Sequence, residues 1–246
     1  MNRILVALDV DSSIEATTLA DLLRGSVGGF KIGKQLFTAE GPSIVRALSE
    51  RGDRVFLDLK FHDIPNTVAG AVAASIATGA WMVNVHAAGG RKMMAAAAEA
   101  AATAAARQQR RRPLVIGVTV LTSLNEAELY ETGVYRPVLD QVVHLARLAQ
   151  DSGLDGVVAS PQEIAAIRAA CGTGFLIVTP GIRLQSSQPA ADDQARTLGP
   201  AEAVEAGASF LVVGRPITRA TDPRAAAWQI AAEIARSDAA ASRQAQ

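Results

Sequence analysis

The chain has 246 residues, of which 49% are hydrophobic and 20% are charged, so it can bury a full-sized core. Lysine plus arginine and aspartate plus glutamate number 24 each, and this balance argues against a nucleic-acid-binding protein driven by net positive charge. No apolar run reaches transmembrane length and the first residues show no signal-peptide pattern, so we expect a cytoplasmic protein that binds neither nucleic acid nor membrane.

Short apolar runs alternate with amphipathic helical stretches along the chain. Eight runs are rich in β-branched and aliphatic residues, as expected of strands covered on both faces: 4–9, 29–33, 54–60, 81–86, 114–120, 156–160, 175–179 and 210–214. Helices are predicted between them, several ending at a glycine that suits a C-terminal cap: 13–25, 41–52, 67–79, 137–153 and 161–172. The alanine-rich stretch 93–113 predicts a solvated outer helix.

This alternation predicts a single (β/α)8 TIM barrel formed by residues 1–236, with the active site at the C-terminal ends of the strands. A doubly wound open sheet is the alternative. It would usually use fewer strands and place a glycine-rich phosphate turn after the first strand, where this chain has LDVDSS. The last residues, 237–246, are polar and unpatterned, and we expect a frayed tail. The single cysteine, Cys171, cannot form an internal disulfide and fits a structural position at a helix end.

Charged residues occur where the predicted strands end. Asp9 closes the first strand and Lys31 lies in the second. Asp58 and Lys60 close the third, and Asp63 follows in the loop. Because residues 58 and 60 are two apart, their side chains leave the same face of the strand, roughly 6.6 Å apart along it.

In this arrangement the neighbouring Leu57 and Leu59 face the helices and the charges point into the barrel mouth. A buried ion-pair network that only fixes structure is the alternative interpretation. Burying charge costs several kcal/mol per ion, and a hydrophobic replacement is often no worse for stability. Several such residues at successive strand ends therefore favour a functional site.

The loops after the seventh and eighth strands form a second candidate region. The loop 181–197 is long and rich in Gly, Ser, Gln and Pro, which suggests a lid. After the eighth strand, Gly214 allows close backbone approach and Arg215 can donate two hydrogen bonds to phosphate oxygens. The position of these loops predicts a phosphate site.

The run DLKFHDIPNT carries a resemblance to a known family. Together with LDV, FKIGKQLF, VTVLTS, TPGIR and VVGRPI at other predicted strand ends, it closely resembles the bacterial-type orotidine 5′-phosphate decarboxylases. The resemblance spans residues 4 to about 220. It implies decarboxylation of orotidine 5′-monophosphate to uridine 5′-monophosphate, the last step of de novo pyrimidine nucleotide synthesis, without a metal or other cofactor.

The resemblance also implies residue roles and a homodimer with shared active sites. The catalytic array would comprise Lys31, Asp58, Lys60 and Asp63, with Lys60 stabilising and protonating a carbanion at C6 of the substrate. Asp63 and Thr67 would come from the partner subunit. The remaining substrate contacts would be Asp9 and Lys31 at the ribose, Thr122 and Ser123 at the pyrimidine, and Arg183, Gln194, Gly214 and Arg215 at the phosphate. The loop between Arg183 and Gln194 is slightly longer than the family pattern.

Two other functions remain open. A Mg²⁺-dependent sugar-phosphate decarboxylase of the same barrel superfamily has a similar motif, but an acidic residue where this chain has Lys31. A non-catalytic phosphate-ligand-binding barrel would not need the charged array. The three histidines are interpreted as structural: His86 beside the site, His62 in the loop and His144 on an outer helix.

Overall fold

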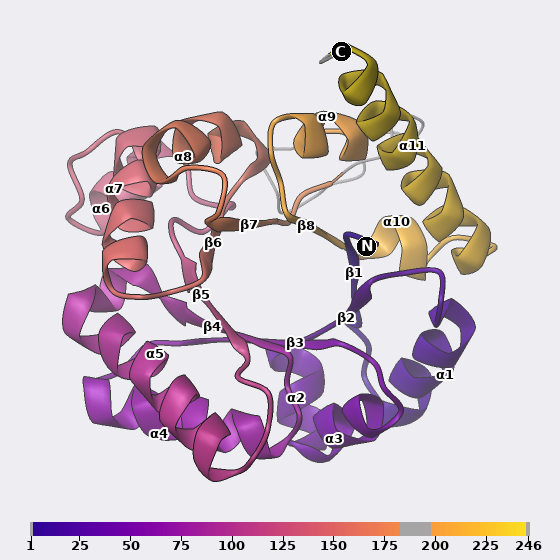
Figure 1. Cartoon of the computed structure of the whole chain (residues 1–246), viewed down its shortest axis with the longest axis horizontal. Helices are drawn as coiled ribbons and strands as arrows, with labels where there is room; N and C mark the ends of the chain where they lie inside the picture. The colour runs from indigo at the N-terminus through magenta and orange to yellow at the C-terminus, as the bar shows by residue number, and fades with distance from the viewer. Residues whose placement is uncertain (1, 183–197, 245–246) are drawn as a thin grey trace.

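The computed structural model describes residues 2–182 and 198–244, and its strands close into a parallel barrel surrounded by helices (Figure 1). Each strand pairs with its neighbours in the chain, and β1 also pairs with β8. The strands are β1 (Ile4–Ala7), β2 (Gly29–Gly33), β3 (Val55–Phe61), β4 (Met82–His86), β5 (Leu114–Val118), β6 (Gly156–Val158), β7 (Leu176–Thr179) and β8 (Phe210–Val213). This topology confirms the predicted (β/α)8 barrel and excludes the open sheet.

Helices connect successive strands on the outside of the barrel. The first half of the chain forms α1 (Ser13–Leu23), α2 (Lys34–Glu40), α3 (Ser43–Glu50), α4 (Pro65–Ala77), the 3-10 turn η1 (Ala87–Gly89) and α5 (Gly90–Arg107). The second half forms α6 (Glu126–Glu131), α7 (Val138–Asp151), the 3-10 turn η2 (Pro161–Glu163), α8 (Ile164–Cys171), α9 (Pro200–Glu205), α10 (Arg215–Thr218) and α11 (Pro223–Gln244). No helix of the described residues is both long enough and apolar enough to cross a membrane.

Two apolar layers hold the barrel together, because side chains alternate between the two faces of each strand. Inward-facing residues fill the barrel interior: Leu5, Ala7, Phe56, Met82, Ile116, Val178, Phe210 and Val212. The alternate positions, including Val6, Ile32 and Leu57, pack against the helices. The filled interior leaves the carboxyl ends of the strands as the place where polar side chains can gather.

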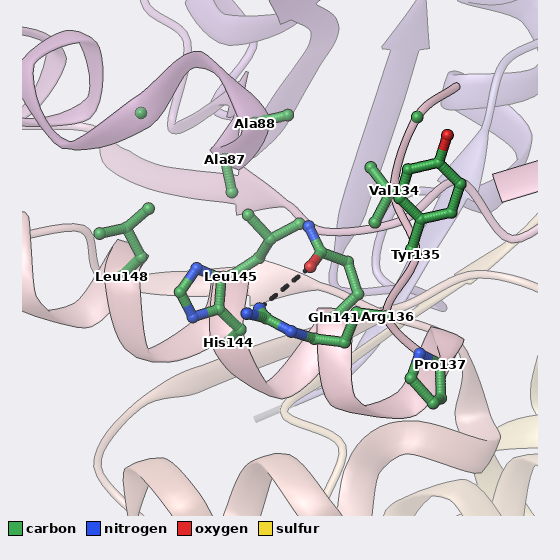
Figure 2. Close-up of a pocket in the computed structure, with 12 residues that line it drawn as sticks. Ala87, Ala88, Val134, Tyr135, Arg136, Pro137, Gln141, His144, Leu145 and Leu148 are labelled. Atoms are coloured by element: carbon green, nitrogen blue, oxygen red, sulfur yellow. Dashed lines mark hydrogen bonds between the residues drawn. The ribbon is translucent and has the colours of Figure 1, made fainter. Parts of the chain in front are cut away.

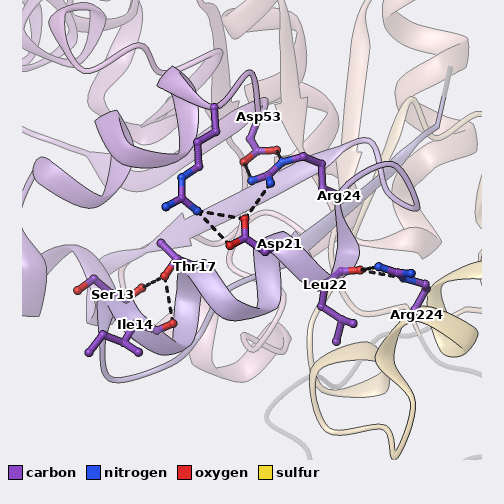
Figure 3. A network of polar contacts seen from close by, with 9 residues as sticks. Ser13, Ile14, Thr17, Asp21, Leu22, Arg24, Asp53 and Arg224 are labelled. Atoms are coloured by element: carbon purple, nitrogen blue, oxygen red, sulfur yellow. Dashed lines mark hydrogen bonds and ion pairs between the residues drawn. The ribbon is translucent and has the colours of Figure 1, made fainter.

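A polar network ties the first helix to its neighbours (Figure 3). Arg24, just after α1, donates to both carboxylate oxygens of Asp53 at 2.9 and 2.7 Å, and to Asp21 at 2.8 Å. Arg224 of α11 donates to the carbonyl oxygen of Leu22 at 2.9 and 2.7 Å. The last helix is thereby joined to the first, next to the β1–β8 closure.

The structure differs from the sequence-based expectations at several element ends. Helix α11 continues to Gln244 and includes most of the segment 237–246 for which we expected a frayed tail. The alanines of that segment have high helix propensity and no glycine or proline stops the helix, which accounts for the difference. Cys171 ends α8 and is buried, as expected of a structural thiol, and burial raises its pKa.

Candidate active site

Three of the predicted charged residues meet inside the barrel mouth, and a fourth lies at its rim. The Asp58 carboxylate receives the Lys60 ammonium at 2.7 Å on one oxygen and faces the Lys31 ammonium at 3.6 Å on the other. Lys31 also donates to Asp9 Oδ1 at 3.1 Å. The side chains of Lys31 and Asp58 are 10% and 12% exposed, whereas Asp9 is 57% exposed. The result is a chain of alternating charges that leads from the rim into the interior.

Strand alternation explains why these side chains converge. Asp58 pairs across the sheet with Gly33, and both occupy inward-facing positions. A Cβ atom at Gly33 would lie 3.0 Å from the Lys31 ammonium nitrogen and 3.2 Å from Asp9 Oδ1. The glycine therefore leaves the space that the Lys31–Asp9 pair occupies. Leu57 and Leu59 pack toward the helices, as expected. The alternate residues Asp58 and Lys60 therefore point into the barrel mouth.

The charges around Asp58 decide its ionisation. Burial favours the neutral acid, but the Lys31 and Lys60 ammonium groups and the hydrogen bonds from Lys60 and Asn84 outweigh it, so the pKa of Asp58 lies below its ordinary value of 3.8. At neutral pH the site therefore holds one buried carboxylate between two ammonium groups.

Asn84 is a part of this site that the sequence analysis did not single out. It lies on β4, is fully buried, and donates to Asp58 Oδ1 at 2.6 Å while its carbonyl oxygen accepts from the backbone N–H of Lys60 at 2.8 Å. The sequence does carry a signal for it. In the run WMVNVH, Asn84 is a polar residue at an inward position of an otherwise apolar strand.

The histidines occupy the positions expected of them. His86 ends β4 on the same face as Asn84, and its ring centroid lies 5.3 Å from that of His62. Burial, together with the positive charges of His62, Lys60 and Lys34, lowers the pKa of His86 to about 4. His144 is exposed on α7. Among the described residues, no group of three or more His, Cys, Asp or Glu side chains could hold a metal ion.

Asp63 is the one member of the predicted catalytic array that the structure keeps apart from the rest. Its side chain is exposed, and its Oδ1 accepts from the Ile64 backbone N–H at 2.6 Å. Thr67 is also exposed, in the first turn of α4. Within the part of the chain that the structure describes, Asp63 forms no ion pair with Lys31 or Lys60.

The other predicted substrate contacts lie in the loops that follow β5 and β8. Thr122 is half-buried and Ser123 is exposed in the β5–α6 connection. Gly214 and Arg215 follow β8, where Gly214 precedes α10 and Arg215 is exposed. A Cβ atom at Gly214 would meet Ala7 at an ordinary 3.6 Å. Arg183, Gln194 and nearly all of the predicted lid lie outside the described residues.

A cavity on the outside of the barrel does not contain the charged array. Its volume is about 810 Å³, and Figure 2 shows it between η1 and the amino-terminal part of α7. Its lining includes Ala87, Tyr135, Arg136 and His144, and Arg136 donates to Gln141 at 3.2 Å. None of the four charged residues described above lines it. The array instead occupies the barrel mouth, where functional residues of such barrels gather.

A closed parallel barrel with buried, alternating lysines and aspartates at the carboxyl ends of its strands defines a (β/α)8-barrel enzyme. Comparison with known proteins narrows the class. The family model described as "Orotidine 5'-phosphate decarboxylase / HUMPS family" matches residues 2–230, so the chain belongs to that family.

Individual relatives cover nearly the whole chain. The chain is 56% identical over 234 residues to an orotidine 5′-phosphate decarboxylase of Moorella thermoacetica, covering 95% of this chain and 92% of the relative. It is 54% identical over 237 residues to the corresponding protein of Alkalilimnicola ehrlichii, covering 96% and 98%. The crystal structure of orotidine 5′-phosphate decarboxylase from Lactobacillus acidophilus superimposes with a TM-score of 0.84 at 36% identity, covering 95% of this chain and 99% of that one.

Proposed function

We propose that this protein decarboxylates orotidine 5′-monophosphate to uridine 5′-monophosphate, in the cytoplasm and without a metal ion or organic cofactor. The observation that carries the proposal is the Lys60 ammonium held 2.7 Å from Asp58 at the barrel mouth, in a chain that the family model matches over residues 2–230. The 50% or greater identity to proteins named for this activity supports the same substrate.

The chemistry explains why such an array is needed. The bond between C6 and the carboxyl carbon breaks, the electron pair remains on C6, and CO2 leaves. That pair lies in the plane of the ring and cannot spread into the π system. A fixed ammonium beside C6 stabilises the developing charge and then gives it a proton. Lys60 has this role in our proposal, because its ammonium is fixed by Asp58 while the side chain as a whole remains 26% exposed at the mouth.

The neighbouring charges orient Lys60 and hold the substrate. Asp58 faces the substrate carboxylate, which disappears as CO2 departs. Lys31 balances the charge of Asp58 and, together with Asp9, contacts the ribose. Thr122 and Ser123 bind the pyrimidine end. The support for this assignment is the alternating contact chain from Asp9 through Lys31 to Asp58.

The phosphate would be bound on the opposite side of the mouth, by Gly214 and Arg215 with Arg183 and Gln194. The phosphate does not react, but its contacts stabilise a closed loop and so lower the barrier of the chemical step. The exposed position of Arg215, two residues after the end of β8, supports this region. The loop 181–197 acts as the lid.

A homodimer with shared active sites completes the proposal. Asp63 and Thr67 are exposed and separated from the array of their own chain, and Ile64 between them is 67% exposed. Large apolar side chains are also exposed in the β5–α7 connection, including Tyr135 at 82%. Exposed apolar side chains of this kind are typical of a face that a partner covers. In the dimer, Asp63 and Thr67 reach the site of the other subunit.

The competing functions predict different behaviour. A Mg²⁺-dependent sugar-phosphate decarboxylase is disfavoured because the Lys31 ammonium lies 3.6 Å from the Asp58 carboxylate, where it would repel a divalent cation. A silent ligand-binding barrel would not require a buried carboxylate flanked by two lysines, an arrangement that is costly to bury.

One assay separates the three functions. Purified protein is mixed with orotidine 5′-monophosphate in EDTA, and the loss of substrate absorbance is followed. We expect full activity in EDTA. Activity that appears only with Mg²⁺, or only on a sugar phosphate, would support the first alternative, and binding without turnover would support the second.

A further inference from the structure

The third strand contains a distortion at the catalytic lysine. In the β3–β4 ladder, Leu57 pairs with Val83 and Phe61 pairs with Val85, so the three residues 58–60 lie opposite Asn84 alone. Lys60 has a φ of 53°, in the left-handed region that side-chain-bearing residues rarely adopt. A bulge of this kind leaves backbone groups without ladder partners and re-aims the side chains that it carries.

The Asn84 side chain replaces the missing ladder contact. Its carbonyl oxygen accepts from the Lys60 backbone N–H at 2.8 Å, and its amide nitrogen donates to Asp58 Oδ1 at 2.6 Å. The orientation of the amide is fixed by its partners, because a backbone N–H can only donate and a carboxylate can only accept. The residue is fully buried, so water cannot take over either contact.

We infer that Asn84 is a positioning residue, which holds the left-handed Lys60 backbone and the Asp58 carboxylate in register so that the Lys60 ammonium meets C6 of the substrate. A strained backbone conformation persists only where its surroundings determine it, and here one side chain contacts both ends of the bulge. Without Asn84, the Lys60 backbone can relax toward a regular strand and its ammonium moves away from Asp58. The kinetic test of this inference rests on the proposed decarboxylase activity. The test by hydrogen exchange, which uses no substrate, does not.

The first variant removes both contacts. Asn84→Ala should lower kcat by about 100-fold, the loss associated with misplacing a reacting group by roughly 1 Å, and should change KM by less than about threefold. KM should change little because the proposed phosphate contacts follow β7 and β8, whereas Asn84 lies on β4. Thr119→Val is the matched control. It removes a part-buried hydrogen bond of 2.9 Å to the Val158 carbonyl oxygen just after β5, does not contact Lys60 or Asp58 in the way that Asn84 does, and should leave kcat near the wild-type value.

A second variant distinguishes positioning from general stability. Asn84→Asp keeps an oxygen for the Lys60 N–H but sets a second carboxylate against Asp58. Two carboxylates that share a site raise one pKa, so the new acid becomes protonated as pH falls. The protonated acid can donate to Asp58 and accept from Lys60, as asparagine does. The kcat of Asn84→Asp relative to wild type should therefore rise with falling pH. A variant that was merely less stable would show no such recovery.

A measurement without substrate keeps the inference separate from the proposed function. In the ligand-free protein, hydrogen exchange of the Lys60 amide should be faster in Asn84→Ala than in wild type, while the amides of β7 and β8 remain unchanged. This result would support the role of Asn84 even if the wild type failed to decarboxylate orotidine 5′-monophosphate. Unchanged Lys60 exchange, a wild-type kcat in folded Asn84→Ala, or a pH-independent deficit in Asn84→Asp would each overturn it. If Asn84→Ala does not fold, Asn84→Asp alone decides.

Discussion

At the scale of single residues, the barrel mouth is a set of charges whose protonation states depend on one another. The depressed pKa of Asp58 means that its carboxylate contributes stability at pH values above the ordinary 3.8, and that this contribution is lost as pH falls through the lower pKa of the folded state. The two flanking ammonium groups keep Asp58 ionised and are in turn held by it. Neutralising Asp58 would leave two partly buried lysines with fewer compensating contacts.

His86 provides a test of this electrostatic environment. Burial and the neighbouring positive charges lower its pKa to about 4 from 6.5, so the folded protein keeps the ring neutral where an unfolded chain binds a proton. The free energy of unfolding should therefore fall as pH drops from 6.5 toward 4. His86→Gln should flatten that part of the curve, measured by urea denaturation at several pH values. An NMR titration of the His86 ring with a midpoint near 6.5 would contradict this account.

At the scale of elements, Arg168 connects two short segments at the amino-terminal end of the barrel. One segment precedes β7 and the other precedes β8, the two strands that are followed by the proposed phosphate loops. Arg168 of α8 donates to Gly207 O at 2.9 and 2.7 Å and to Ser209 Oγ at 3.0 Å, just before β8. It also donates to the carbonyl oxygens of Gly172, Thr173 and Phe175, before β7. The guanidinium thus joins two β-strands at the end of the barrel away from the charged array.

Replacing that arginine should reduce stability more than activity. We expect Arg168→Met to lower the free energy of unfolding by about 2–4 kcal/mol, because several partly buried carbonyl groups lose a charged donor. The kcat should stay within about twofold of wild type. Arg91→Met is the control. Arg91 is 55% exposed and pairs with Asp151 at 3.3 Å, so its loss should cost less than about 1 kcal/mol. Equal losses in the two urea titrations would show that the Arg168 contacts contribute little.

The elements also show what the sequence could predict. Alternation of apolar runs and helical stretches predicted the eight strands within about two residues at their ends, and the spacing of Asp58 and Lys60 predicted their common face. The bulge at Lys60 was not predictable, because it depends on a side chain of the next strand rather than on local propensity. Asn84 does stand out in the sequence as a polar residue at an inward position of an apolar strand, but that signal does not say what it contacts. Its function appears only when β3 and β4 are paired.

At the scale of the whole molecule, the separation of Asp63 from the array has a direct consequence. If Asp63 acts in the partner's site, a site needs Lys60 from one chain and Asp63 from the other. Lys60→Ala and Asp63→Ala homodimers should each be inactive. After subunit exchange at equal amounts, about half of the dimers are mixed and each mixed dimer has one intact site, so about a quarter of wild-type activity should return. Complete exchange, checked by mass spectrometry, without any recovered activity would place Asp63 in its own subunit's site.

The central claim is that the Lys60 ammonium, fixed by Asp58 at the barrel mouth, stabilises and protonates the C6 carbanion. The most direct test is kcat of Lys60→Ala on orotidine 5′-monophosphate, compared with wild type. Circular dichroism and sedimentation should show that fold and oligomeric state are unchanged. We predict a loss of at least about 10³-fold, because the variant lacks both the electrostatic stabilisation and the proton donor. Retention of a tenth or more of wild-type kcat in the folded variant would contradict the account.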